Sequence, residues 1–415
     1  MLAKCLHGGM SAMLMWIIVS SLAAFLVAWV NGANNAANAI GTAVGSKALT
    51  LRRALILTAI FDFLGAILFG KFVSKTLLKG IVDIHVYSNP YIVMYGMFCA
   101  LIATGIWVIV ATWFRIPMSI SQAIVGGVMG LGLGTLGPQV IDWSRVSIIL
   151  FSWYTLPFFS GLIAVGIYTL MNKYMNKMST SRLPLMSTIL FSTFIFTSVF
   201  LLSVKTLKAS DVVFAIEYSI LVVIILSIPY YIVFKYKMPR EVEEASKFTY
   251  RVLLVMAAAT MAFSHGANDV ANSAGPLTGV LIIASEHRIP STVSIPLEVL
   301  ALCASGIAIG VLMWGYRVVE TLGEKITTLT VQTAFIAQFS ASIAVLIVTR
   351  LGLPVSTTVA IVGAVAGVGF ARGVRNVNIK LLIKIITVWT AAVPVVALMS
   401  AVFLRILLYV TPPIY

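Results

Sequence analysis

Long apolar stretches separated by short polar connections fill almost the whole chain. An apolar helix of about 20 residues is long enough to cross the hydrocarbon core of a bilayer, so each stretch predicts a membrane span. Two further apolar segments are shorter and rich in glycine, and they either cross the bilayer or turn back within it. The long stretches lie near residues 10–30, 51–70, 90–112, 145–169, 185–204, 212–234, 250–263, 291–314, 331–349 and 381–411, and the short ones at 117–136 and 354–371. We therefore expect an all-α polytopic membrane protein with about 10 to 12 transmembrane segments, some of them discontinuous or re-entrant.

The chain repeats its own motifs in the same order. An asparagine-rich run at residues 31–38 returns in modified form at residues 264–272. Residues 117–132 match residues 354–369 at nine of sixteen positions, and both copies begin with proline. This order predicts a duplicated bundle, and the number of crossings between the copies decides whether the second one is inverted. We expect two homologous, inverted repeats.

The most polar stretch, residues 235–250, lies between the two copies. Its lysines and arginines favour the cytoplasmic side by the positive-inside rule, although the loop near 205–211 also carries two lysines. The sequence therefore predicts a first half at 1–234 with repeat 1, an exposed cytoplasmic linker at 235–250, and a second half at 251–415 with repeat 2.

Composition supports a membrane protein and narrows its partners. Of the 415 residues, 60% are hydrophobic and 10% are charged, whereas soluble domains have about 25% charged residues. The net charge of +15 fits the positive-inside rule and anionic lipid headgroups, and it would also attract an anionic substrate. The basic residues are scattered between apolar spans, which argues against nucleic-acid binding. We expect a multi-pass protein of the cell (plasma) membrane, surrounded by the lipid bilayer.

The two asparagine-rich motifs place amide oxygens on one face of a membrane helix, because residues three or four apart share a face. An oxygen-rich face suits a hard cation such as sodium. Asparagine and small residues also hold neighbouring membrane helices together, but the duplication favours a functional site. Gly32 and Gly266 permit close helix approach or local unwinding. The candidate sodium ligands in the two motifs are Asn31, Asn35, Asn38, Asp269 and Asn272.

Two carboxylates fall inside apolar segments. A carboxylate in hydrocarbon is costly unless it is paired, protonated or facing a cation. Asp269 corresponds to Asn35 in the first copy, so the two half-sites differ in charge. Asp62 lies in the second apolar stretch and is either a further sodium ligand, as we assign it, or the partner of a neighbouring arginine. His265, beside the second motif, either bonds locally or titrates.

Each repeat also contains a proline followed by hydroxyl side chains and then an apolar helix. This order is typical of a helix that begins inside the membrane. Its free N–H groups and positive dipole end attract an anion, and the hydroxyls add donors. Ordinary proline-kinked helices, with serines bonded to their own backbone, are the alternative. Two such termini facing each other would hold a multiply charged oxyanion, and the candidate ligands are Ser119, Ser121, Gln122, Ser356, Thr357 and Thr358.

Together these motifs resemble the inorganic phosphate transporter family of sodium- or proton-coupled phosphate symporters. The resemblance implies inverted repeats, a transport part that moves against a scaffold, and a homodimer. It also implies that phosphate binds at the paired Pro-Ser segments, with Asn34 and Asn268 beside them, and that sodium binds at the asparagine motifs. It extends over nearly the whole chain and rests on Gly32–Ser46, Ser264–Asn272, Ser356–Thr358 and Trp389 with Pro394.

We therefore expect sodium-coupled uptake of inorganic phosphate by alternating access, with sodium as the coupling ion and no organic cofactor. Members of this family often carry aspartate where Asn35 occurs here, so a proton-coupled phosphate or sulfate permease is the main alternative. A passive channel is a different class and would not accumulate its substrate. An enzyme is not expected, because the sequence contains no nucleophile–base set and no metal-binding cluster.

Overall fold

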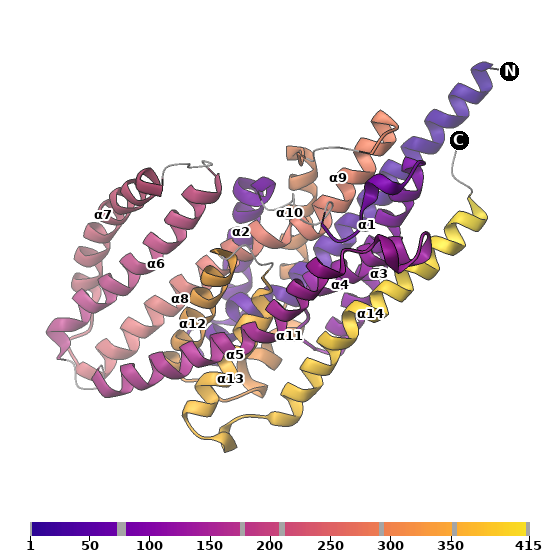
Figure 1. Cartoon of the computed structure of the whole chain (residues 1–415). Coiled ribbons are helices and arrows are strands. Elements are labelled where there is room, and N and C mark those ends of the chain that lie inside the picture. The colour runs from indigo at the N-terminus through magenta and orange to yellow at the C-terminus, as the bar shows by residue number, and fades with distance from the viewer. Residues whose placement is uncertain are drawn as a thin grey trace.

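The computed structural model describes residues 2–72, 80–174, 179–206, 212–289, 294–350 and 355–411. Within these ranges the chain is almost entirely helical and contains no strand, apart from one isolated β-bridge between Val82 and Ile141 (Figure 1). The predicted class, an all-α polytopic membrane protein, is confirmed. The helices long and apolar enough to span a membrane are Met13–Gly45, Pro90–Trp113, Trp143–Tyr174, Val212–Lys237, Leu297–Trp314 and Ile379–Val410, and shorter apolar helices are Ile120–Gly134, Val331–Val345 and Thr357–Ala371.

The helices follow the order that the apolar pattern predicts. The first half contains α1 (Leu2–Gly45), α2 (Leu51–Phe69), α3 (Pro90–Trp113), α4 (Ile120–Gly134) and α5 (Trp143–Tyr174). A hairpin of α6 (Leu183–Thr206) and α7 (Val212–Lys237) comes next. The second half contains α8 (Val242–Asp269), α9 (Ala271–Glu286), α10 (Leu297–Trp314), α11 (Tyr316–Glu320), α12 (Val331–Arg350), α13 (Thr357–Ala371) and α14 (Ile379–Val410).

The polar segment between the halves is more helical than a linker at 235–250 would be. Helix α7 continues to Lys237 and α8 begins at Val242, so the connection itself is short. One turn into α8, the exposed Lys247 ammonium lies 2.5 Å from the exposed Glu243 carboxylate. This end of α8 is therefore polar and faces water, whereas its other end carries the second motif into the protein. The division into halves at this point remains a prediction.

Helix α1 differs most from the predicted spans, because it continues from the expected 10–30 segment to Gly45 without a break. Alanines between the asparagines favour this continuity, since alanine is the strongest helix former. The second motif is instead divided at Val270, between α8 and α9. Gly32 and Gly266 allow neighbouring helices to approach closely. A Cβ on Gly32 would overlap the Ile307 carbonyl, and one on Gly266 would overlap the Asp62 carbonyl.

The two halves pack against each other in matched pairs. Helix α1 packs on α10 and α8 on α2; α4 packs on α14 and α13 on α5. Each half therefore completes the other, as expected for duplicated bundles. Figure 1 shows α5 and α14, the long helices that follow the two short ones, running in opposite directions.

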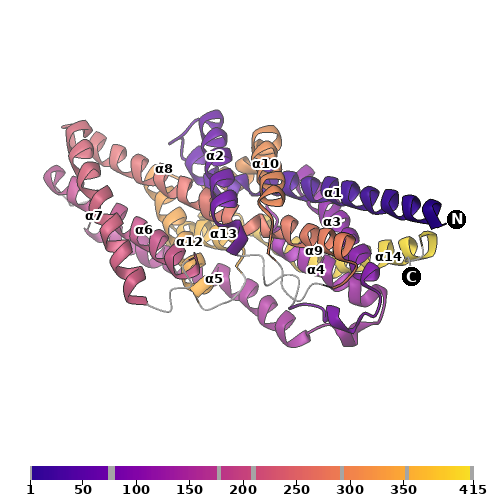
Figure 2. The ribbon, with the colours of Figure 1, turned by 90° about the horizontal axis from the view of Figure 1, so that it is seen from above.

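The α6–α7 hairpin lies at one end of the molecule, and both termini lie at the other end (Figures 1 and 2). It joins the rest of the protein mainly through α8. Much of α7 is apolar and exposed, for example Phe214, Ile225 and Ile232, which fits a helix in contact with lipid. The candidate site lies away from this hairpin, where α1, α4, α8 and α13 come together.

Candidate functional site

Four asparagines of α1 form the centre of the site. Asn31, Asn34, Asn35 and Asn38 are at most 1% exposed, although they lie in an apolar helix. A buried amide is costly unless its donors and acceptor are paired. The hydrogen bonds of these side chains reach α3, α8, α13 and the connection before α4, so the elements of the site are arranged around α1.

Asn34 fixes the segment that leads into α4. Its Oδ1 accepts a hydrogen bond from the Met118 backbone N–H over 2.7 Å. Its Nδ2 donates to the Thr112 hydroxyl over 2.9 Å and to the Ile116 carbonyl over 3.0 Å. All of these contacts lie on one stretch of chain around Pro117. Asn34 therefore holds the first Pro-Ser segment at α1.

The short helices α4 and α13 begin beside each other inside the protein. Each has 15 residues, about 22 Å of helix, whereas the hydrocarbon core is about 30 Å thick. The Thr358 hydroxyl of α13 lies 3.2 Å from the Met118 carbonyl, directly before α4. Asn38 donates to the same hydroxyl over 2.8 Å and to that of Thr357 over 3.3 Å. The predicted pair of helix starts is thus brought together on α1.

The first turns of both short helices offer backbone and side-chain donors at this point. Ser119 is the N-cap of α4, and its side chain makes no cap hydrogen bond. Ser356 is the N-cap of α13 and accepts a hydrogen bond from the Val359 N–H over 3.3 Å. Asn272 donates to the Ser121 hydroxyl over 3.3 Å. Pro354, which begins the second segment in the sequence, lies outside the described residues.

A buried acid–imidazole network joins the two asparagine motifs. His265 Nδ1 lies 2.9 Å from Asp62 Oδ1, and His265 Nε2 lies 3.3 Å from Asp269 Oδ2. Asn35 donates to Asp269 Oδ2 over 3.2 Å and to Asn31 Oδ1 over 2.9 Å. Asp62, His265 and Asp269 are 0%, 1% and 5% exposed. The alternative that Asp62 pairs with a neighbouring arginine is therefore wrong, because its partner is His265.

Three buried oxygens at the site have no hydrogen-bond donor among the described residues. They are Asn38 Oδ1, Gln122 Oε1 and Asp62 Oδ2. Buried polar atoms are normally paired, so unpaired oxygens mark places that accept a proton donor or a cation. Asn268 is half-buried and joins none of the hydrogen bonds described above. The other candidates from the two motifs each take part in at least one of these hydrogen bonds.

Sequence reasoning missed two side chains that complete this cluster. Gln338 of α12 donates from Nε2 to the Asn38 carbonyl over 3.1 Å and accepts from the Thr42 hydroxyl over 2.8 Å. The Thr112 hydroxyl of α3 accepts a hydrogen bond from the Asn34 side-chain amide. Gln338 is an amide inside an apolar span, the same signal that identified the asparagines, but it lacks a repeated motif. Thr112 carries no sequence signal, because threonines are common in membrane helices.

A polar cluster at discontinuous helices in the middle of a duplicated helical bundle defines a polytopic membrane transporter. Residues 31–400 match the model of the phosphate transporter family. The chain belongs to that family. It is therefore a phosphate transporter and not an enzyme, and it is a multi-pass protein of the cell membrane.

Relatives with similar sequences extend over almost the whole chain. A putative phosphate permease of Thermococcus kodakarensis is 36% identical over 411 residues, which cover 97% of this chain and 100% of the relative. The inorganic phosphate transporter 2-1, chloroplastic, of Arabidopsis thaliana is 32% identical over 91% of this chain and 70% of its own length. A solved structure, the sodium-dependent phosphate transporter, has a TM-score of 0.89 and 37% identity over 95% of this chain and 100% of that chain.

Proposed function

We propose that the protein takes up inorganic phosphate together with sodium by alternating access. The proposal rests on one observation: the first turns of α4 and α13 lie at α1, beside the cluster of asparagine amides that contains Asp269. Phosphate needs donors and positive potential, whereas sodium needs oxygens. Both kinds of group lie side by side here, so binding of the cation and the anion would stabilise each other.

Phosphate binds, in this proposal, between the first turns of α4 and α13. The unpaired N–H groups and dipoles of both turns point to the anion, and the hydroxyl and amide side chains add donors. Asn34 is fully engaged with the connection before α4, so it acts by holding that segment. Asn268 lies on the α8 motif and is half-buried, which leaves its amide available to the anion. The proposed ligands are Ser119, Ser121, Gln122, Ser356, Thr357 and Thr358.

Sodium binds, in this proposal, at the amide and carboxylate oxygens between α1 and the α8–α9 break. Asp269 supplies the negative charge, and it lies directly before the junction of α8 and α9 at Val270. Asn38 Oδ1 and Asp62 Oδ2 are further oxygens without a donor. The name of the solved relative, a sodium-dependent transporter, supports this choice of ion. The proposed ligands are Asn31, Asn35, Asn38, Asp62, Asp269 and Asn272.

Alternating access requires two related arrangements of the bundle. The matched packing of α4 on α14 and of α13 on α5 supports inverted repeats, because each half presents the same kind of interface to the other. The family resemblance adds a homodimer. Size-exclusion chromatography with light scattering in detergent tests the dimer independently of transport.

The test of the proposed function is uptake of radiolabelled phosphate into proteoliposomes that contain the purified chain. An inward sodium gradient is compared with an equal potassium gradient, and sulfate is added as a competitor. Accumulation that needs sodium and resists sulfate is expected. Uptake that is equal in both gradients, or that sulfate blocks, would refute sodium–phosphate symport.

A second candidate, proton-coupled uptake, is favoured by the chain of titratable groups Asp62, His265 and Asp269. Such a chain is a common proton route inside membranes. Uptake driven by external acid in the absence of sodium would support it. The same proteoliposomes answer this question when a pH gradient replaces the sodium gradient.

A further inference from the structure

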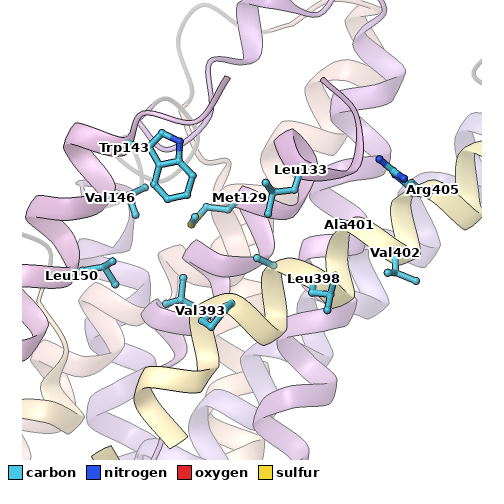
Figure 3. A pocket seen from close by; sticks show the side chains of 12 residues that line it. Met129, Leu133, Trp143, Val146, Leu150, Val393, Leu398, Ala401, Val402 and Arg405 are labelled. Atoms are coloured by element: carbon cyan, nitrogen blue, oxygen red, sulfur yellow. The ribbon is translucent and has the colours of Figure 1, made fainter. Parts of the chain in front are cut away.

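A pocket of about 530 Å³ lies outside the proposed transport site, between α4, α5 and α14 (Figure 3). Tyr154 of α5 donates to the Thr390 hydroxyl of α14 over 3.0 Å, which links these two helices. The pocket fills the wedge between them on the side of the C-terminal end of α14. It is lined by Met129, Leu133, Trp143, Val146, Leu150, Val393, Pro394, Ala397, Leu398, Ala401, Val402 and Arg405.

The lining of this pocket is apolar, with one cationic exception. Arg405 donates from Nε to the Gly134 carbonyl over 3.3 Å and makes no ion pair among the described residues. The Trp143 indole N–H is already bonded to the Pro138 carbonyl. The pocket therefore offers a long apolar wall and one guanidinium at its end, as Figure 3 shows. A guanidinium pairs well with a phosphate group.

The position of the charge along α14 fits the depth of a lipid headgroup. From Pro394 to Arg405 the helix rises about 16 Å, close to half of the roughly 30 Å hydrocarbon core. Arg405 is about 8 Å before the end of α14 at Val410, and Trp143 is the first residue of α5. Tryptophan is enriched at the membrane interface, and an arginine near a helix end extends its charge to that interface. The pocket thus extends over one leaflet, from the middle of the bilayer to its surface.

We propose that this pocket binds one acyl chain of an anionic phospholipid whose phosphate pairs with Arg405. The acyl chain lies along α14 and fills the wedge between α5 and α14. The anionic headgroup is favoured over a zwitterionic one because the guanidinium has no carboxylate partner among the described residues. The lipid is a bound component of the bundle and is distinct from the transported phosphate.

The test is photolabelling of the full-length chain in liposomes with diazirine-tagged phosphatidylglycerol or phosphatidylcholine, followed by mass spectrometry of the labelled peptides. Labels are expected at residues 143–150 and 393–402, with a preference for phosphatidylglycerol of roughly fivefold, the effect of one basic residue near the membrane surface. Arg405→Gln should remove the preference, and Arg405→Lys should keep most of it. Lys384→Gln, an exposed change on the same helix at its other end, is the matched control and should change nothing.

A second variant tests the acyl-chain wall. Val402 lines the pocket and is 45% exposed, so Val402→Trp fills the pocket without entering the core. This variant should lower labelling by both lipids several-fold. Equal labelling by the two lipids in the unchanged chain, or an undiminished preference in Arg405→Gln, would overturn the proposal. Disulfide formation between two copies of Leu398→Cys would also overturn it, because a second copy would then cover the pocket.

Discussion

The Thr358 hydroxyl lies 3.2 Å from the Met118 carbonyl oxygen, and this contact joins the starts of the two short helices, α13 and α4. The two residues are far apart in the sequence and belong to different repeats. Asn38 donates to the same hydroxyl from α1. One threonine therefore links three elements at the point where we place phosphate, so changes at Thr358 should act on phosphate binding before they act on the fold.

Thr358→Val should weaken phosphate binding and leave the protein folded. The substitution keeps the shape of the side chain but removes the shorter of the two hydrogen bonds of the Asn38 amide, which then keeps only the 3.3 Å contact to Thr357. Loss of a buried hydrogen-bond partner costs about 1–3 kcal/mol. We expect the KM for phosphate to rise roughly 5- to 100-fold. The measurement is initial phosphate uptake in proteoliposomes. Thr278→Val is the control, because among the described residues that buried hydroxyl bonds only to Ala274 of its own helix. Equal effects of both variants would remove Thr358 from the site.

Asp269→Asn should abolish the stimulation of uptake by sodium. The change removes the carboxylate that Asn35 and His265 contact, and with it the negative charge that balances the cation. Loss of one partner from a buried charged cluster costs about 3–5 kcal/mol, so the sodium affinity should fall roughly 100-fold or more. Uptake is measured over a range of sodium concentrations. Asp142→Asn, at an exposed acid outside the site, should behave as the unchanged chain does. Full sodium-driven uptake by Asp269→Asn would contradict the assignment.

The contact between Asp62 and His265 predicts that the stability lost in one variant is restored by a second substitution. His265→Gln leaves the fully buried Asp62 carboxylate without its imidazole partner, and an unpaired buried charge is strongly destabilising. We expect a clear drop in the melting temperature of the detergent-solubilised protein. Adding Asp62→Asn to His265→Gln removes the charge and should restore a large part of that loss. A double variant that is less stable than His265→Gln alone would show that the pair does not act as described.

Much of the fold could be predicted because the membrane makes the sequence simple to interpret. The length of the apolar stretches predicted the helices, and the duplicated motifs predicted the matched halves and the functional polar residues. The expected span near residues 10–30 is shorter than α1, because the asparagines end the apolar stretch but do not end the helix. In the structure the amides of Asn34, Asn35 and Asn38 donate hydrogen bonds to other helices, so a polar run continues inside the helix.

The partners within the site could not be predicted, because they depend on which helices meet. Nothing near Asp62 in the sequence identifies His265, which comes from the other repeat. Gln338 reaches Asn38 only because α12 packs beside α1. The sequence thus indicates which residues are too polar for their surroundings, and the packing of helices decides how each one is paired.

The contact between α1 and α10 gives a last prediction, on stability. A Cβ on Gly32 would overlap the Ile307 carbonyl, so Gly32→Ala requires the two backbones to separate. Forced overpacking of this kind costs about 1–3 kcal/mol, and it would also displace the neighbouring Asn31 from Asp269. We expect a lower melting temperature together with reduced uptake. Gly275→Ala in α9 is the matched control, because a Cβ there would meet nothing within 4 Å; it should be neutral or stabilising by about 0.5–1 kcal/mol, since alanine is the better helix former. If Gly32→Ala melts at the same temperature as Gly275→Ala, close approach at Gly32 is not required.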